Sequence, residues 1–286
     1  MTGGTPLDRS ALDAHPVPPV TAGDKDSKGR ILVVAGSRDV PGAALLTATA
    51  AMRAGAGKLQ IATIESIAPH IGIAMPEAMV IGLPEEDGGF AAAAVDPLAE
   101  HAAKADAVIA GPGLSQGEVC RSIAGALLDT DGAIALDAAL LHALRPAREA
   151  RPSLPVLLPH AGEMASLLDC EPDQIEADPI GCGLRAAELY RSLVLVKGVV
   201  SHVVTPDGRC WTYRGGSAGL GVSGSGDVLA GIVGGLLARG ADPLNALLWS
   251  VWLHGEAGAR LSRSVGPLGF LAREIARQVP ALLRGA

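Results

Sequence analysis

Short apolar runs alternate with longer segments rich in alanine and leucine along most of the chain. The apolar runs cover residues 31–34, 59–63, 107–110, 134–137 and 156–158, and a helical segment opened by Pro41 follows the first of them. This alternation is typical of βαβ units. The runs are apolar at nearly every position, as expected where helices cover both faces of a parallel sheet. The pattern predicts an α/β fold with a mostly parallel central sheet and helices on both faces.

The pattern changes beyond residue 193. Three short strands are predicted at residues 194–196, 202–204 and 210–213, with the turn Pro206-Asp207-Gly208 marking a hairpin between the last two. Helical patterns follow at residues 226–238, 243–261 and 271–283. No internal repeat or change of composition divides this region, so we expect one catalytic domain over residues 28–286.

The first 27 residues are rich in proline, aspartate and glycine, and they lack the basic start and apolar centre of a secretory signal. We expect residues 1–27 to form a disordered tail. The four cysteines are scattered and form no Cys-x-x-Cys pair, which suits reduced thiols in the cytoplasm. We assign no metal ligand in this chain and expect a cytoplasmic protein.

The charge of the chain limits its partners. A net charge of −7 and a pI near 5.5 argue against nucleic acid, which is bound through clustered lysine and arginine. The apolar stretches around residues 228–238 and 246–253 are too short to cross a membrane. We therefore expect small-molecule partners, and any phosphate group should be held largely by backbone N–H groups.

A glycine-rich segment at residues 219–231 stands directly before the predicted helix at 226–238. Unpaired N–H groups and the positive end of the helix dipole make such a helix start a site for anions. We predict an anion hole at Gly224, Ser225 and Gly226, with Asp227 as the catalytic carboxylate beside it. The alternative is that Asp227 only caps the helix, since aspartate is a favoured cap residue. The Gly-x-Gly-x-x-Gly match in this segment has the wrong context for a dinucleotide fold, and the chain has no P-loop motif.

Four further motifs follow or end predicted strands. They are Gly-Pro-Gly at 111–113, Leu-Asp-Ala at 136–138, Pro-His-Ala-Gly-Glu at 159–163 and Val-Lys-Gly at 196–198. Open α/β sheets build their sites at the carboxyl ends of strands, which makes these motifs candidate site segments. Two of their residues also have structural alternatives, because His160 could cap a helix at residues 161–168 and Lys197 could be a solvated lysine.

Taken in order, these motifs resemble those of the ribokinase-like NAD(P)H-hydrate dehydratases. The resemblance runs from about residue 28 to residue 285 and also includes Lys28-Gly-Arg30, Pro41-Gly-Ala-Ala44 and Arg53-Ala-Gly-Ala-Gly57. It implies a ribokinase-like fold and an ADP-dependent lyase that restores NADH or NADPH from the S epimer of the hydrated nucleotide. It further implies ADP, or ATP, as phosphoryl donor, Mg²⁺ as cofactor, and a homo-oligomer, a tetramer in related proteins.

The resemblance also implies roles for individual residues. Positions that hold the hydrated nucleotide in the family correspond to Ala44, Gly113, His160 and Asp227. Positions that hold the adenine nucleotide correspond to Lys197, Gly198, Val199, Val200, Ser201 and Gly226, and the catalytic carboxylate corresponds to Asp227.

The chain departs from the family pattern at Ala161, where proline is usual, and at Ser217 and Val222, where asparagine and threonine are usual. The last two changes remove polar groups near the predicted phosphate loop. Two other functions therefore stay open at the level of sequence: an ATP-dependent kinase of a small alcohol, such as a sugar or vitamin precursor, and a nucleotide-binding regulator that has lost catalysis.

Overall fold

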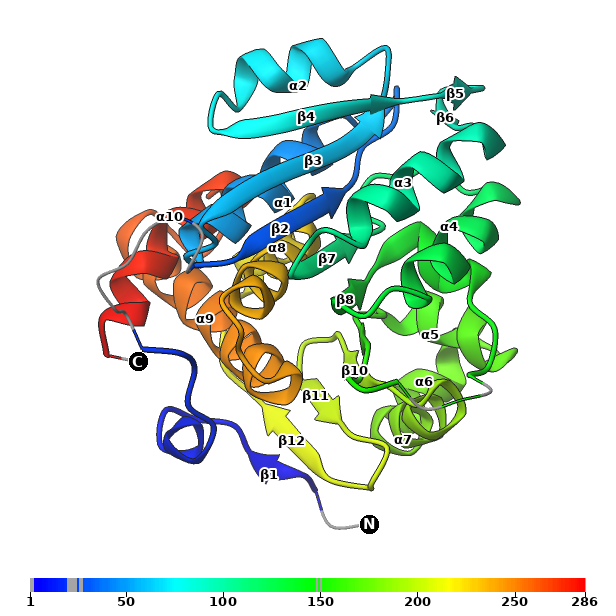
Figure 1. Ribbon diagram of the computed structural model, residues 1–286. Coiled ribbons are helices and arrows are strands. Elements are labelled where there is room, and N and C mark those ends of the chain that lie inside the picture. Colours follow the sequence, from blue (N-terminus) through cyan, green and yellow to red (C-terminus); the bar gives the residue numbers. More distant parts are fainter. Residues whose placement is uncertain (1–2, 20–24, 26–27, 148, 150, 286) are drawn as a thin grey trace.

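A single large sheet organises the molecule. The computed structural model describes residues 3–19, 25, 28–147, 149 and 151–285. In this part of the chain ten strands form one sheet, in the order β1-β12-β11-β10-β9-β8-β7-β2-β3-β4 (Figure 1). The strands are β1 (Thr5–Pro6), β2 (Arg30–Val34), β3 (Lys58–Ile64), β4 (Ala78–Leu83), β7 (Ala107–Ala110), β8 (Ala133–Leu136), β9 (Val156–Leu157), β10 (Leu193–Val196), β11 (Ser201–Val204) and β12 (Cys210–Tyr213). A separate small ribbon consists of β5 (Glu85–Glu86) and β6 (Gly89–Phe90).

The pairing of the strands is parallel from β4 through β10. Only β11 runs against its neighbours, β10 and β12. The chain reverses between β11 and β12 at the predicted hairpin, where Gly208 has a φ of 90°. The predicted fold class, a mostly parallel central sheet flanked by helices, is confirmed.

Helices cover the two faces of the sheet (Figure 1). One layer is formed by α1 (Gly42–Arg53), α8 (Ser225–Ala238), α9 (Pro243–Ser264) and α10 (Ala272–Leu282), which pack on one another. The other layer is formed by α3 (Val95–Ala102), α4 (Val119–Leu128), α5 (Ala161–Leu168), α6 (Pro172–Ala177) and α7 (Pro179–Tyr190). At the edge of the sheet α2 (Ala68–Ala74) packs against β4.

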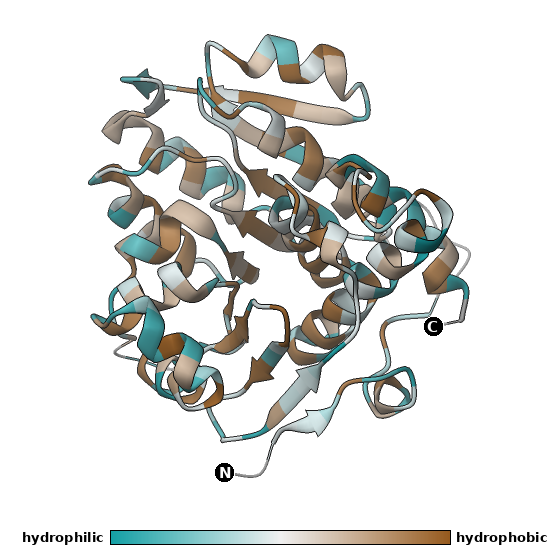
Figure 2. Ribbon diagram, turned by 180° about the vertical axis from the view of Figure 1, so that it is seen from behind, coloured by the Kyte–Doolittle hydropathy of each residue, from teal (hydrophilic) through white to brown (hydrophobic). Residues whose placement is uncertain are grey.

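The core lies between the sheet and these two layers, and Figure 2 shows hydrophobic residues concentrated on the central strands. The strands β2 and β7 are buried along almost their whole length, which explains their continuous apolar sequence. Within the described residues, no helix is both long and apolar enough to span a membrane.

The structure differs from the expected disordered tail over residues 3–19. The strand β1 forms one edge of the sheet by pairing in parallel with β12, and Leu12 is completely buried. The indole N–H of Trp249 donates to the carbonyl of His15 over 2.7 Å. The polar composition of the segment predicted disorder, but two leucines and a few backbone hydrogen bonds are enough to hold it against the rest of the protein. Residues 1, 2, 20–24, 26 and 27 lie outside the described residues.

The predicted site motifs all lie at the carboxyl edge of the parallel strands. Gly111 follows β7, Asp137 follows β8, His160 follows β9 and Lys197 follows β10. Gly111 has a φ of 122°, and a side chain there would come within 1.8 Å of the Asp137 carbonyl oxygen. Glycine is required at this position because two strand ends approach each other too closely for any Cβ.

The start of α8 reaches the same edge because α8 packs very closely on α1. A Cβ at Gly231 would lie 2.2 Å from the Thr47 carbonyl oxygen, and one at Gly235 would lie 2.4 Å from the Ala51 carbonyl oxygen. The two backbones are therefore in direct contact. Glycine inside a helix lowers the stability of that helix. We therefore attribute the glycines at these two positions to the close approach of α8 and α1.

This contact predicts the outcome of a matched pair of glycine substitutions. We expect Gly231→Ala to lower the free energy of unfolding by about 1–3 kcal/mol, since the new methyl group meets backbone that cannot yield without separating the helices. We expect Gly125→Ala in α4, where a Cβ meets nothing within 4 Å, to raise it by up to about 1 kcal/mol. Urea unfolding of both variants measures the difference. Equal effects of the two substitutions would contradict the proposed packing.

Candidate active site

The first turn of α8 presents backbone N–H groups to the carboxyl edge of the sheet. The helix is capped by Gly224 in the left-handed conformation, with a φ of 86° and no side-chain cap. The N–H of Ser225 donates to the Val222 carbonyl over 3.1 Å, so it is already used in the turn. Among the described residues, no acceptor faces the N–H groups of Gly226 and Asp227. These two groups can therefore bind an anion.

Asp227 lies in this first turn and makes no side-chain cap to the helix. Burial and, after it, the nearby Asp137 carboxylate raise the pKa of its carboxyl group to about 6, against the opposing effect of the Lys197 ammonium. The alternative that Asp227 is only a cap residue is not what the geometry shows. Its carboxylate is instead partly desolvated and remains mostly ionised at neutral pH.

A buried ion cluster stands opposite Asp227. The Nζ atom of Lys197 lies 2.7 Å from Asp137 Oδ1 and 3.7 Å from Glu163 Oε2. Burial disfavours the ammonium form, but the two carboxylates outweigh burial and raise the pKa of Lys197. Lys197 is therefore a charged, fixed residue of the site and not the solvated lysine that the sequence left possible. The role of Asp137 as its closest partner was not predicted.

His160 caps α5, as one of the two sequence interpretations expected. Its Nδ1 atom accepts from the N–H groups of Gly162 and Glu163, and Glu163 Oε2 accepts from the His160 N–H in return. The Nε2 atom lies 3.3 Å from Glu163 Oε1, and the imidazole is still 59% exposed, so a ligand can contact its exposed side. Ala161 at the first position of α5 preserves this capping box, even though proline is usual there.

A cavity of about 820 Å³ lies between the start of α8 and the loop after β10. It brings together seven of the predicted site residues, namely His160, Lys197, Gly198, Val199, Ser201, Ser225 and Gly226. Val199 is almost completely exposed at its mouth. Val200, Gly224 and Asp227 do not line this cavity, although they adjoin it in sequence.

The other two predicted substrate-binding residues lie apart from this cavity, near the start of α1. A Cβ at Gly113 would meet Ala43 Cβ at 2.5 Å, and Gly113 has a φ of 65°. Ala44 is completely buried and faces Gly36. Any contact of Ala44 with a ligand would therefore be made through its backbone.

The two loop departures do not disturb the anion-binding turn. Ser217 Oγ donates to the Gly258 carbonyl over 3.2 Å, and Val222 accepts the Ser225 N–H with its backbone carbonyl, a bond that any residue could make. The valine side chain packs against the core. The turn is thus fixed by backbone bonds and packing and not by the polar side chains that are missing.

One residue of the site carries no motif signal in the sequence. His254 in α9 lines the cavity, and its Nε2 atom lies 3.0 Å from Ser225 Oγ. A lone histidine within a long helical pattern gives no hint of this contact, which joins positions 29 residues apart.

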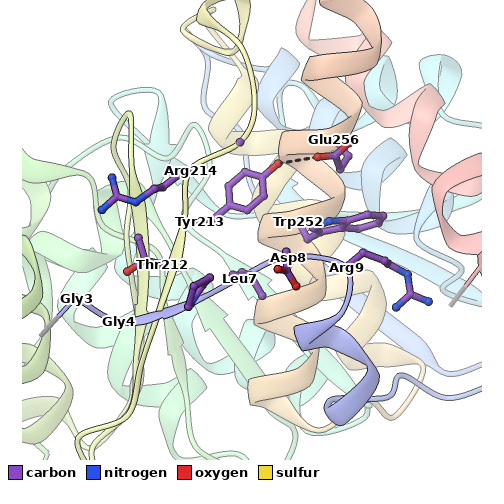
Figure 3. Close-up of a pocket in the computed structure, with 12 residues that line it drawn as sticks. Gly3, Gly4, Leu7, Asp8, Arg9, Thr212, Tyr213, Arg214, Trp252 and Glu256 are labelled. Atoms are coloured by element: carbon purple, nitrogen blue, oxygen red, sulfur yellow. Dashed lines mark hydrogen bonds between the residues drawn. The ribbon is translucent and has the colours of Figure 1, made fainter.

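A second hollow of about 530 Å³ lies beside the end of β12 (Figure 3). Tyr213, Arg214 and Gly215 line both hollows, and the Tyr213 hydroxyl lies 3.3 Å from Glu256 Oε1. None of the predicted site residues lines this second hollow. Among the described residues, no group of three or more histidine, cysteine, aspartate or glutamate side chains could hold a metal ion.

Replacing Asp227 should stabilise the unliganded protein in a pH-dependent way. The pKa of its carboxyl group is about 6 in the folded protein and 3.8 without burial, so folding carries a penalty above about pH 6 that fades toward pH 4. We expect Asp227→Asn to raise the free energy of unfolding by on the order of 3 kcal/mol near pH 8 and by about half of that near pH 5.

Urea unfolding at both pH values measures this difference, and Asp39→Asn, at an exposed position, serves as the control. A gain from Asp227→Asn that is independent of pH, or no larger than that of the control, would contradict the buried-carboxylate assignment.

Comparison with known proteins assigns the chain to a family. The model of the NAD(P)H-hydrate dehydratase family matches residues 31–281. The chain is 45% identical over 275 residues to the ADP-dependent (S)-NAD(P)H-hydrate dehydratase of Xanthomonas campestris pv. campestris, covering 96% of this chain and 94% of that protein. It is 40% identical over 280 residues to the bifunctional NAD(P)H-hydrate repair enzyme of Gloeobacter violaceus, and it spans about half of that longer protein, 51%.

A solved structure agrees with these matches. The ADP/ATP-dependent NAD(P)H-hydrate dehydratase of Bacillus subtilis, co-crystallised with ATP and Mg²⁺, superimposes with a TM-score of 0.86 at 28% identity and covers 100% of this chain and 99% of that one. The shared ribokinase-like fold, the matched family model and the high identity lead to one conclusion: the chain belongs to the NAD(P)H-hydrate dehydratase family.

Proposed function

We propose that the protein uses ADP to dehydrate the S epimer of hydrated NADH or NADPH and so restores the reduced nucleotide. The ring hydroxyl of the hydrate attacks the β-phosphorus of ADP, AMP leaves, and the hydroxyl oxygen becomes part of a phosphate ester. The lone pair of the ring nitrogen then expels phosphate by breaking the ring C–O bond. Loss of a proton from the neighbouring ring carbon restores the double bond.

The observation that supports this reaction is the position of Asp227 beside the free N–H groups of Gly226 and its own backbone. A carboxylate whose pKa is about 6 is ionised at neutral pH and accepts the hydroxyl proton as the oxygen attacks. The N–H groups stabilise charge on the transferring phosphoryl oxygens. A carboxylate is a weak base, but the position and desolvation of Asp227 make it sufficient to accept this proton.

The loop of residues 197–201 is proposed to hold the adenine nucleotide. The Lys197 ammonium is fixed at the base of the cavity by Asp137, and the Ser201 hydroxyl donates to the Gly198 carbonyl over 3.3 Å, which closes the loop on itself. Val199 at the cavity mouth offers an apolar surface. The hydrated nucleotide is proposed to contact Ala44, Gly113 and His160, with Asp227 between the two ligands.

The carboxylates near Lys197 fit the requirements of Mg²⁺. This ion prefers oxygen donors and is usually bound by one or two carboxylates together with substrate phosphates and water. Asp137 and Glu163 supply two such carboxylates, both within 4 Å of Lys197 Nζ. A Mg²⁺ ion held there would supply positive charge that offsets the negative charge of the nucleotide phosphates.

The other two functions are less well supported. A kinase of a small alcohol could use the same Asp227 site, but relatives of 45% and 34% identity are named ADP-dependent (S)-NAD(P)H-hydrate dehydratases. A regulator without catalysis would be favoured by a damaged phosphate loop, whereas backbone bonds hold this loop in place. That the protein forms a homo-oligomer and acts in the cytoplasm stays a prediction.

The first functional prediction concerns Asp227→Asn. We expect this variant to lose at least roughly a hundredfold in kcat, because the amide keeps the shape of the side chain but accepts no proton. Its affinity for ADP should stay within about threefold of the wild type. The test follows NADH formation from NADH hydrate and ADP, with ADP binding measured by calorimetry. Near-normal turnover by the purified variant would remove Asp227 from the mechanism.

The second functional prediction concerns stereochemistry. A site that must align one hydroxyl with a phosphoryl group should accept only one epimer of the hydrate. We expect a mixture of epimers to give a fast phase that stops short of completion, followed by a slow phase limited by spontaneous epimerisation. An added epimerase should accelerate only the slow phase. If chiral chromatography instead shows both epimers disappearing at equal enzyme-dependent rates, the substrate assignment is wrong.

A further inference from the structure

The first residue of α8 is in contact with a histidine from the next helix. His254 Nε2 lies 3.0 Å from Ser225 Oγ and 3.1 Å from the Ser225 carbonyl oxygen. Both residues line the cavity beside the anion-binding turn. The glycine-rich helix start predicted Ser225 as part of the anion hole through its backbone, and the family resemblance gave His254 no role.

The direction of these hydrogen bonds follows from the carbonyl group. A carbonyl oxygen only accepts, so Nε2 of His254 must carry a hydrogen to bond it. Burial lowers the pKa of the imidazole to about 4, against the opposing effect of the Ser225 carbonyl and together with the nearby Lys197 ammonium, so the ring is neutral at neutral pH. A neutral imidazole has one N–H, which places the hydrogen on Nε2 and leaves a lone pair on Nδ1.

This tautomer determines whether the Ser225 hydroxyl donates to His254 or accepts from it. Since Nε2–H points at both serine oxygens, the Ser225 Oγ atom can only accept from it and cannot donate to it. Among the described residues, the His254 ring is the one hydrogen-bond partner of this hydroxyl. The Ser225 N–H is already engaged with Val222. The hydroxyl hydrogen is therefore left to point into the cavity, where Ser225 itself is only 6% exposed.

We propose that the Ser225 hydroxyl is a third donor of the anion hole, beside the N–H groups of Gly226 and Asp227, and that His254 is the positioning residue that turns its hydrogen toward the transferring phosphoryl oxygens. This inference rests on the proposed function. A free hydroxyl rotates among three staggered positions, whereas a preorganised donor needs no reorganisation as charge develops. The histidine thus acts on the reaction only through the serine.

A set of four variants tests the proposal. We expect Ser225→Ala to lower kcat by roughly a hundredfold, the typical effect of removing one oxyanion donor, with KM changed less than about threefold. Ser225→Thr, which keeps a hydroxyl, should recover most of this loss. His254→Leu should match Ser225→Ala, and His254→Gln, whose amide N–H reaches a similar position, should recover most of kcat.

The double variant separates positioning from a general structural effect. If His254 acts through the Ser225 hydroxyl, adding His254→Leu to Ser225→Ala should lower kcat by less than about threefold more. If the kcat losses of the two single variants multiply in the double variant, the proposal is wrong. A Ser225→Ala variant that keeps more than about a third of the wild-type kcat would also overturn it.

The tautomer can be measured without turnover. Long-range ¹H–¹⁵N spectra of the full chain near neutral pH should show His254 as a neutral ring with its hydrogen on Nε2. A charged ring, or a hydrogen on Nδ1, would overturn the proposed hydrogen bonds. Failure of the wild type to turn over NADH hydrate would refute the proposed function instead, and the spectrum would still decide the state of His254.

Discussion

The close contact between α1 and α8 is the constraint on which the site depends. Gly231 and Gly235 bring the α8 backbone against the carbonyl groups of Thr47 and Ala51, so α8 lies closer to α1 than a helix with side chains at these positions could. Gly234 brings the same helix against Ile31 and Ile109 of the sheet. Its first turn therefore meets the carboxyl edge of the parallel strands. Asp227 and the free N–H of Gly226 are placed there by helix packing, and the loop before them only has to turn the chain.

The electrostatics of the site have to favour phosphate groups although the chain as a whole is acidic. Phosphates must be bound in a protein with a net charge of −7. The helix start provides partial positive charge without any side chain, and the buried Lys197 ammonium offsets part of the negative charge of Asp137 and Glu163 beside it. The same Lys197 limits the rise in the pKa of Asp227, so this carboxylate stays mostly ionised at neutral pH.

The sequence predicted those features that depend on local pattern. The strands β7 and β12 begin and end where the apolar runs do, and the glycine-rich turn before Asp227 is where the helix starts. Contacts between distant segments could not be predicted. The pairing of Lys197 with Asp137 joins residues 60 apart, and that of His254 with Ser225 depends on how α9 packs on α8. The strand β1 was missed because two residues carry no periodicity.

The origin of the oxygen in the released phosphate tests the proposed reaction most directly. NADH hydrate prepared in ¹⁸O-water carries the label in its ring hydroxyl, and the protein would be supplied with this hydrate and unlabelled ADP in ordinary water. If the hydroxyl is phosphorylated and then leaves as phosphate, each phosphate released with a new NADH contains one ¹⁸O atom. Unlabelled phosphate, with the ¹⁸O recovered in water, would contradict the account, because it would mean that ADP is hydrolysed without transfer to the ring oxygen.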